Sequence, residues 1–256
     1  MLPIERQNKY LDLLSNKDVI TISDFMSKFN ISIETVRRDL SILEKQDKIE
    51  KVYGGAKLKR SLLSEPAMQD RMIHKIKEKD CIGRKCSEFI DDGDCIFIDS
   101  GSTTYHITKH IKDKKNLTII TNSIAVINEL INTDFEIIII GGKIRHEERS
   151  VVTFDYIFNF SELNIQKSFI CAGGVTVENG ISDFNMQEAV TRKKIIERSR
   201  KIYVAADSSK LGRDVMINIA PLDKINFIIT DSFLNKGIAK DFEKSETSLI
   251  LAYTPQ

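Results

Sequence analysis

Six short apolar runs rich in Ile and Val recur through residues 95–230, and stretches with helical spacing separate them. Strands that alternate with helices predict a largely parallel sheet, and uninterrupted apolar runs predict that both faces of that sheet are covered. We therefore expect this part of the chain to form an α/β domain. The runs are CIFID at 95–99, LTIIT at 117–121, EIIII at 136–140, SFICAG at 168–173, KIYVAAD at 201–207 and NFIIT at 226–230.

Small or polar residues follow each of these runs directly. A single turn of this kind would need no further explanation, since every strand end requires turn residues. The carboxyl ends of parallel strands, however, converge on the crevice where ligands bind. Six such ends favour one ligand site. We expect it to include Asp99, Asn122, Gly141, Gly142 and Gly173.

The segment SGSTT at 100–104 lies between the first run and an expected helix. Hydroxyls and backbone N–H groups at a helix start suit a phosphate or another anion. Lys210 and Arg145 are candidate positive charges for that anion, and Asp99 is a candidate acceptor for sugar hydroxyls. The chain has neither a GxxxxGK[ST] loop nor a GxGxxG fingerprint, so we expect no nucleotide cofactor. The segment contributes Ser100, Gly101, Ser102, Thr103 and Thr104 to the expected site.

The first sixty residues predict three helices. Pro3 suits the first turn of a helix that ends near Asn16, and Thr21 can cap a short second helix. Asn30 tolerates the left-handed conformation that ends this helix, and Ser32 can cap a third one through residues 33–46.

The third helix buries one stripe and turns its other face outward. Apolar residues recur at offsets of three and four, which is the spacing of a buried stripe, at Ile33, Val36, Leu40 and Leu43. Two short helices joined by a tight turn, with arginine on the second, have the geometry to enter the major groove, where the guanidinium fork can bond guanine. The alternative is a solvated face on which the arginines pair with Asp39 or Glu34. The outward residues are Thr35, Arg37, Arg38 and Ser41.

A small hairpin is expected next, because IEKVYGGAKL at 49–58 alternates on either side of Gly54 and Gly55. Residues 1–60 carry a net charge of +3, the remainder carries −2, and the basic excess gathers in residues 45–60. Such a patch suits contact with DNA phosphates, although a solvated turn gives the same pattern.

The stretch ISIETVRRDLSILEKQDKIEKVYGGA at 31–56 resembles the winged helix-turn-helix signature of the DeoR family of bacterial repressors. The resemblance implies that the third helix is the recognition helix and that the hairpin is the wing. It also implies that the residues contacting operator DNA are Ser32, Thr35, Arg37 and Arg38 from the helix, and Lys51, Tyr53 and Lys57 from the wing.

The remaining chain resembles the sensor domain of the same family through SEPAMQDR, DSGSTT, TNS at 121–123, GGKIR at 141–145 and DSSK at 207–210. The resemblance implies a Rossmann-like fold similar to ribose-5-phosphate isomerase, and a phosphorylated sugar or polyol as effector. Where the family usually has glycine, this chain has Thr153. Since a β-branched residue resists positive φ, we expect the loop there to differ.

These patterns predict a DNA-binding domain at 1–57, a connector with a helix at 58–79, and a sensor domain at 80–256. We expect a cytoplasmic repressor of a carbohydrate-metabolism operon, because no apolar run approaches the length of a membrane span and no signal peptide precedes the first helix. It would act as a homo-oligomer, a dimer or a tetramer, and an effector would release it from its operator.

The same sequence features are compatible with other functions and sites. An activator of the same family would have the same sequence pattern. A sugar-phosphate isomerase with an appended DNA-binding domain could take a general base from Asp183, Glu188, Asp207 or Asp231, but such an enzyme has no use for a recognition helix. The four cysteines lack zinc-site spacing, and His106 and His110 lack a nearby third ligand, so we expect no metal.

Overall fold

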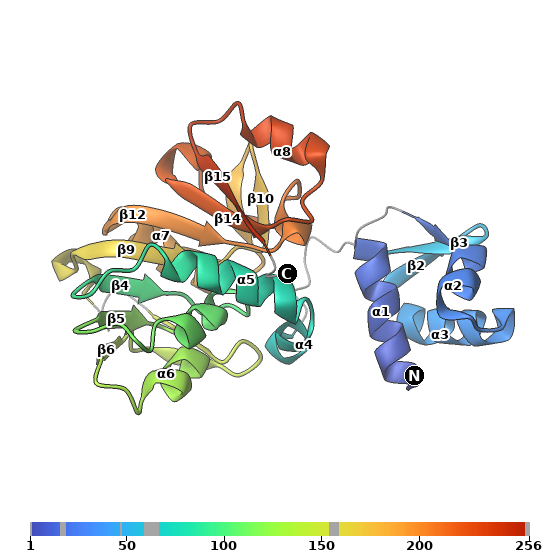
Figure 1. Ribbon diagram of the computed structural model, residues 1–256, viewed down its shortest axis with the longest axis horizontal. Coiled ribbons are helices and arrows are strands. Elements are labelled where there is room, and N and C mark those ends of the chain that lie inside the picture. Colours follow the sequence, from blue (N-terminus) through green and yellow to red (C-terminus); the bar gives the residue numbers. More distant parts are fainter. Residues whose placement is uncertain (1, 16–18, 47, 59–66, 154–158, 254–256) are drawn as a thin grey trace. The chain divides into compact units, whose positions relative to one another are not determined.

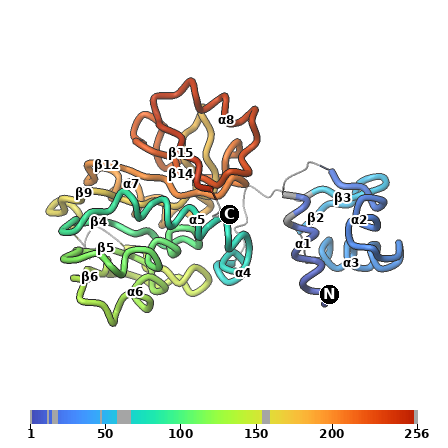
Figure 2. The backbone as a smooth tube through the Cα atoms, in the orientation of Figure 1, coloured from blue at the N-terminus to red at the C-terminus, as the bar shows by residue number. Residues whose placement is uncertain are grey.

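Two units make up the chain, residues 1–61 and residues 62–256, and each has its own hydrophobic core. The structure is a computed structural model that describes residues 2–15, 19–46, 48–58, 67–153 and 159–253 (Figures 1 and 2). Within these residues no helix is long and apolar enough to cross a membrane.

The N-terminal unit has three helices followed by a hairpin. The helices are α1 (Pro3–Ser15), α2 (Ile22–Phe29) and α3 (Ile33–Lys45). The hairpin strands β2 (Ile49–Val52) and β3 (Gly55–Leu58) pair in antiparallel fashion, and the short β1 (Ile20–Thr21) adds to the other edge of β3. This arrangement confirms the winged helix-turn-helix prediction.

The helix ends form where the sequence predicts them. Thr21 caps α2 in a capping box, in which its hydroxyl accepts from the Asp24 N–H and the Asp24 carboxylate accepts from the Thr21 N–H. Asn30 ends the helix with φ 50°, and the Ser32 hydroxyl accepts from the Thr35 N–H at the start of α3. Gly55 is required beside β1, because a Cβ there would lie 2.3 Å from the Ile20 carbonyl oxygen.

A seven-stranded parallel sheet forms the centre of the second unit. All six predicted runs contain a strand of this sheet, and β15 is one that the sequence did not indicate. The order is β15-β14-β12-β9-β4-β5-β6 and every pairing is parallel. The strands are β4 (Cys95–Ile98), β5 (Thr118–Thr121), β6 (Glu136–Ile139), β9 (Ile165–Ile170), β12 (Ser199–Ala205), β14 (Phe227–Asp231) and β15 (Ser248–Ala252).

Both faces of the sheet are covered, as uninterrupted apolar runs predict. In β4, Ile96 and Ile98 join the core under α5 (Ile76–Ser87), η1 (Thr104–His110) and α6 (Ile124–Leu130). Phe97 joins the core on the opposite face with α7 (Met186–Glu197) and α8 (Lys236–Phe242). This second core also includes the antiparallel sheet of β10 (Gly174–Thr176), β11 (Gly180–Asp183) and β13 (Ile217–Ala220).

The remaining described elements are short. They are α4 (Met68–Ile73), the hairpin β7 (Lys143–Arg145) and β8 (Ser150–Val152), and the 3₁₀ turns η2 (Phe160–Glu162), η3 (Ser208–Lys210) and η4 (Leu222–Lys224). The segment after the 100–104 loop is itself a 3₁₀ helix, η1, rather than the α-helix that its apolar spacing suggested.

The order in which the chain adds strands to the sheet changes direction between β4 and β9. From β4 the chain moves outward to β5 and β6, then returns to β9 on the other side of β4 and continues to β12, β14 and β15. At such a switch point the loops leave the carboxyl ends of neighbouring strands in opposite directions, and ligands of open parallel sheets bind there. Residues that follow β4 and β9 are therefore the first candidates for a ligand site.

Candidate DNA-binding surface and candidate effector site

The outward face of α3 carries the predicted arginines. Arg37 and Arg38 are exposed, whereas Val36, Leu40 and Leu43 are buried in the N-terminal core. Within the part of the chain that the structure describes, neither guanidinium forms a hydrogen bond or an ion pair. Both groups therefore stay available to phosphate or base oxygens. Ser32 is exposed and Thr35 is half-buried at the start of the same helix.

Asp39 follows the two arginines but faces the opposite way. It is 2% exposed, and its carboxylate accepts from Arg6 Nε at 2.6 Å and from Gln7 Nε2 at 3.0 Å. Burial and the nearby Asp39 charge raise the pKa of Tyr10 on α1 to about 12. The carboxylate thus fixes α3 against α1 instead of neutralising its arginine neighbours.

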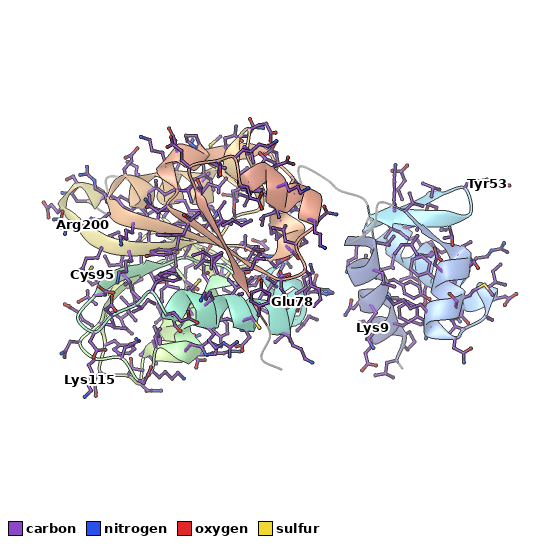
Figure 3. All side chains as sticks on the ribbon, turned by 45° about the horizontal axis from the view of Figure 1, so that its top comes forward. Lys9, Tyr53, Glu78, Cys95, Lys115 and Arg200 are labelled. Atoms are coloured by element: carbon purple, nitrogen blue, oxygen red, sulfur yellow. The ribbon has the colours of Figure 1, made fainter. Side chains whose placement is uncertain are left out.

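The β2–β3 hairpin, the predicted wing, is tied to α3. Lys51 Nζ on β2 lies 2.7 Å from Glu44 Oε2 and donates to Ser41 Oγ at 2.9 Å, and both partners are on α3. Lys57 pairs with Glu50 across the hairpin at 3.0 Å. Tyr53 is fully exposed at the tip, before Gly54 with φ 76° (Figure 3).

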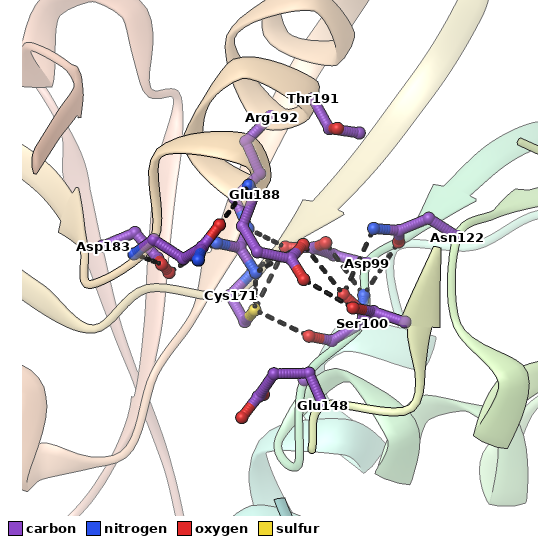
Figure 4. A network of polar contacts seen from close by, with 12 residues as sticks. Asp99, Ser100, Asn122, Glu148, Cys171, Asp183, Glu188, Thr191 and Arg192 are labelled. Atoms are coloured by element: carbon purple, nitrogen blue, oxygen red, sulfur yellow. Dashed lines mark hydrogen bonds and ion pairs between the residues drawn. The ribbon is translucent and has the colours of Figure 1, made fainter. Parts of the chain in front are cut away.

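Asp99 joins the carboxyl ends of β4 and β9 at the switch point. The side chain is fully buried, and its Oδ1 accepts from the Ser100 N–H at 2.8 Å. Its Oδ2 accepts from the Cys171 N–H at 3.0 Å and from Arg192 Nε at 2.6 Å (Figure 4). The carboxylate that the sequence suggested for sugar hydroxyls is thus occupied by donors of the protein itself.

The predicted 100–104 loop is bound to the next strand end. The Ser100 N–H donates to Asn122 Oδ1 at 3.1 Å, and Asn122 Nδ2 donates back to Ser100 Oγ at 3.2 Å. Gly101 is necessary because a Cβ there would lie 2.6 Å from the Cys171 Cβ. The structure therefore brings together the loop and Asn122.

The hydroxyls of this loop differ in their partners. Thr104 Oγ1 donates to the Asp99 carbonyl at 2.7 Å. Ser102 and Thr103 are buried, and among the described residues their hydroxyls have no hydrogen-bond partner. Neither hydroxyl oxygen is among the fully buried unpartnered atoms of the described residues, so both keep some contact with solvent and are open to a ligand oxygen.

Arg192 on α7 is the centre of a buried charge network that the sequence did not reveal. Besides Asp99, its guanidinium bonds Asp183 and donates to Cys171 Sγ at 3.1 Å. Burial would lower the pKa of Arg192, but the carboxylates of Asp183 and Asp99 raise it well above its usual value. One partner is local, since Arg192 Nη2 lies 3.9 Å from Glu188 Oε2 on the same helix, but Asp99 and Cys171 are distant in sequence and nothing in the pattern of α7 indicates them.

Glu188, one turn before Arg192, links the network to the β7–β8 hairpin. Its Oε1 accepts from Arg145 Nη1 at 2.9 Å and from the Ser150 hydroxyl. Burial is the main cause of the raised pKa of Glu188, and Arg192, Ser150 and Arg145 oppose it. Arg145, predicted as an anion ligand, is therefore paired with a buried carboxylate.

The other predicted site residues surround these strand ends. Gly142 begins the β7–β8 hairpin, where a Cβ would lie 2.2 Å from the Val152 carbonyl oxygen, and Gly141 precedes it. At Gly173 a Cβ would lie 2.9 Å from Val215 Cγ2. Thr153 is buried without a positive φ, so its β-branched side chain needs no left-handed backbone.

No group of three or more His, Cys, Asp or Glu side chains in the described residues is arranged to hold a metal ion. His106 Nδ1 and His110 Nε2 both lie near Asp80 Oδ1, at 3.3 and 3.1 Å. Two histidines and one carboxylate oxygen thus form a contact between α5 and η1.

Comparison with known proteins agrees with this division into a DNA-binding unit and a sensor unit. Residues 6–61 match the DeoR-like helix-turn-helix domain and residues 74–232 match the DeoR C terminal sensor domain. The HTH-type transcriptional regulator IolR of Bacillus subtilis (strain 168) is 34% identical over 98% of this chain and 99% of that protein. The glycerol-3-phosphate regulon repressor of Escherichia coli (strain K12) is 30% identical over 91% of this chain and 92% of that protein.

Among solved structures, a ribose 5-phosphate isomerase from Plasmodium falciparum aligns with 52% of this chain and 51% of that chain at 14% identity, with a TM-score of 0.39. The full-length relatives, by contrast, are DNA-binding regulators, which decides against the enzyme alternative. This chain belongs to the DeoR family of helix-turn-helix transcriptional regulators, with a sensor domain after its DNA-binding domain.

Proposed function

We propose that the protein represses a carbohydrate-metabolism operon by binding operator DNA through α3 and the wing, and that a phosphorylated sugar or polyol releases it. The DNA-binding part of the proposal rests on the exposed guanidiniums of Arg37 and Arg38, neither of which forms an ion pair within 4 Å with a carboxylate of the described residues. Arginine in this position can bond phosphates or the O6 and N7 atoms of guanine.

The wing supports the same surface. Lys51, Lys57 and Tyr53 place two ammonium groups and one phenol on the hairpin that follows α3. Contacts from such groups to phosphates orient a recognition helix without reading sequence. Operators of helix-turn-helix proteins are paired half-sites, so we propose a homo-oligomer, a dimer or a tetramer, that works in the cytoplasm where the operator lies.

The effector would bind at the strand ends at the switch point. Ser102 and Thr103 offer hydroxyls that form no hydrogen bond with the described residues, and Lys210 offers a positive charge at the end of β12. The proposed site adds Ser100, Gly101, Thr104, Asn122, Gly141, Gly142, Arg145 and Gly173 around them, with Asp99 holding the loop in place. A relative of this chain is named for glycerol-3-phosphate, a phosphorylated polyol.

Replacement of Ser102 by Asp tests the effector site. The variant would place a carboxylate where the effector phosphate binds, so we expect normal operator affinity but no release by the phosphorylated effector that releases the wild type. The replacement Ser248→Asp, at an exposed position of β15, is the matched control and should respond as the wild type does. Release of Ser102→Asp at the wild-type effector concentration would show that the loop holds no phosphate.

A further inference from the structure

The strand β6 forms one edge of the seven-stranded sheet (Figure 1). On its inner side it pairs with β5, and no strand of the described residues pairs with its outer side. Proteins normally protect such an edge with a lysine or a proline inside the strand, or with a β-bulge. β6 has the sequence EIII and pairs with β5 in unbroken register, so beyond its first residue it has no charge, no proline and no bulge. Its outer backbone N–H and C=O groups can therefore pair with another strand.

Apolar side chains are exposed at both ends of this edge. Ile139 at the end of β6 is 48% exposed, and Ile131 at the end of α6 is 63% exposed. Ile137 packs against the core under α6, so Ile139, two positions later in the strand, points to the same face of the sheet. The turn at 131–135 connects α6 to β6, which places Ile131 near the start of the strand. One face thus has an exposed isoleucine at each end of the edge.

The opposite edge of the sheet differs in this respect. Its strand β15 has three large apolar residues, Leu249, Ile250 and Leu251, and all three are half-buried. The exposed residue of that strand is Ser248. Of the two edge strands, only β6 therefore exposes a large apolar side chain to solvent.

Charged side chains of opposite sign lie at the two ends of β6. Asp134 and Glu136 are at its start, Lys143 follows its end, and all three are exposed. None of them forms an ion pair with another described residue. When two identical strands pair in antiparallel fashion, the start of each lies beside the end of the other. The acidic end of one copy then meets the basic end of the second copy, and Ile139 approaches Ile131 of the second copy.

We propose that β6 pairs with the β6 strand of a second copy of this chain, antiparallel and about a two-fold axis, so that two sheets join into one. A two-fold axis makes every contact occur twice, and the surface is complementary to itself both in apolar side chains and in charge. The inference rests on the proposed function only in that paired half-sites require at least two copies of the chain. It adds the surface that joins them.

The position of this edge gives the interface a link to the candidate effector site. The chain leaves β6 through Gly141 and Gly142 and enters the β7–β8 hairpin, where Arg145 pairs with the buried Glu188 at 2.9 Å. A ligand that shifts this hairpin therefore acts on a segment next to the second copy. Shifts of this kind at a subunit interface are a common route by which a ligand changes an assembly.

Sedimentation of the full chain without DNA tests the interface by measuring the dissociation constant of the assembly. Ile139→Lys places an ammonium group between the paired edges, so we expect it to weaken association by about 30-fold or more, the usual effect of losing a central interface side chain. A wild type that is a tetramer should yield dimers in this variant. Ser248→Lys puts the same charge on the opposite edge strand and is the matched control, which should associate as the wild type does.

A charge exchange tests the antiparallel orientation. Glu136→Lys and Lys143→Glu each bring like charges together at both ends of the interface, so each should weaken association. The double variant Glu136→Lys/Lys143→Glu restores opposite charges and should associate more tightly than either single variant. Association through any other surface gives no such rescue. Both residues are exposed, and circular dichroism checks that the variants are folded.

Three outcomes overturn the inference: a monomeric wild type, an Ile139→Lys variant that associates as the wild type does, and a charge-exchange variant that associates no more tightly than its single variants. The second and third leave the proposed function standing if a phosphorylated sugar still releases the operator, since the copies then join elsewhere. Conversely, if the variants lose association as expected but no phosphorylated compound releases DNA from the wild type, the interface stands and the proposed function fails.

Discussion

Arg192 Nε lies 2.6 Å from Asp99 Oδ2, although the two residues are 93 positions apart in the chain. This bond ties α7 to the end of β4 at the point where the order of the strands reverses. Both side chains are buried, and the same guanidinium also bonds Asp183. The loop that follows Asp99 therefore depends on a helix that the chain forms much later.

Arg192→Met should destabilise the sensor unit by about 3 to 5 kcal/mol, because it leaves two carboxylates buried without their cation. Urea denaturation followed by circular dichroism measures the change. Arg198→Met, at the exposed end of α7, is the control and should shift the free energy of unfolding by less than about 0.5 kcal/mol. Equal effects of the two replacements would contradict the network.

Arg38→Ala should impair operator binding, whereas Asp39→Ala should impair folding stability, although the two residues are neighbours. Arg38 is exposed, so its loss should weaken specific operator binding by about 1 to 3 kcal/mol without changing stability, and Arg37→Ala should do the same to a lesser degree. Asp39→Ala leaves Arg6 and Gln7 without their acceptor and should cost about 3 kcal/mol of folding free energy. Fluorescence anisotropy with labelled operator at matched salt, together with thermal melting, separates the two. If Arg38→Ala and Arg37→Ala both kept wild-type operator affinity, α3 would not be the recognition helix.

Lys51 and Glu44 should affect DNA binding in opposite directions. Lys51→Ala should weaken binding to all sequences alike and reduce the log-log salt slope by about one unit, which is the signature of one lost phosphate contact. Glu44→Gln frees the ammonium from its ion pair and should strengthen binding. Anisotropy titrations at several salt concentrations measure both effects. A change in preference at a single base pair on Lys51→Ala would mean that the wing reads bases.

Lys79 should make the stability of the sensor unit depend on pH under alkaline conditions. Its pKa is about 8 in the folded protein, against an ordinary value of 10.5, so between these values the unfolded chain binds a proton that the folded protein has lost. The free energy of unfolding should therefore rise with pH across this window, by up to about 3 kcal/mol. Subtracting the urea curves of Lys79→Met from those of the wild type isolates this contribution. A flat difference from pH 8 to 10.5 would mean that Lys79 is not desolvated.

The elements that local chemistry determines could be predicted from the sequence. The structure has the predicted helix ends: α2 starts after Thr21 and ends at Asn30, and α3 starts after Ser32. Each of these residues forms its capping hydrogen bond with a residue within four positions. The six apolar runs are strands because no other short element buries Ile and Val on both sides. The run SLILA of the edge strand β15 did not indicate a strand, because it is short and only partly buried at the edge of the sheet.

Buried charges could not be predicted in the same way. Asp39 bonds Arg6, 33 positions away, Lys79 bonds Arg71, 8 positions away, and Arg192 bonds Asp99, 93 positions away. A charged residue in a helical pattern otherwise indicates a solvated face. The bounds of the connector could not be predicted either. The segment 67–79 is rich in charged residues and shows little strand pattern, but it contains α4 and the start of α5. Only the fold reveals that this segment faces Asp207.

Operator release by phosphorylated compounds tests the central claim most directly. Selection from a random double-stranded DNA library would supply the operator, and anisotropy would then follow its complex with the full-length protein during titration with sugars and polyols, each with and without phosphate. We predict that at least one phosphorylated compound dissociates the complex, while its unphosphorylated counterpart does not. Selection of no preferred sequence, or equal release by the two forms, would contradict the account of a sugar-phosphate-responsive repressor.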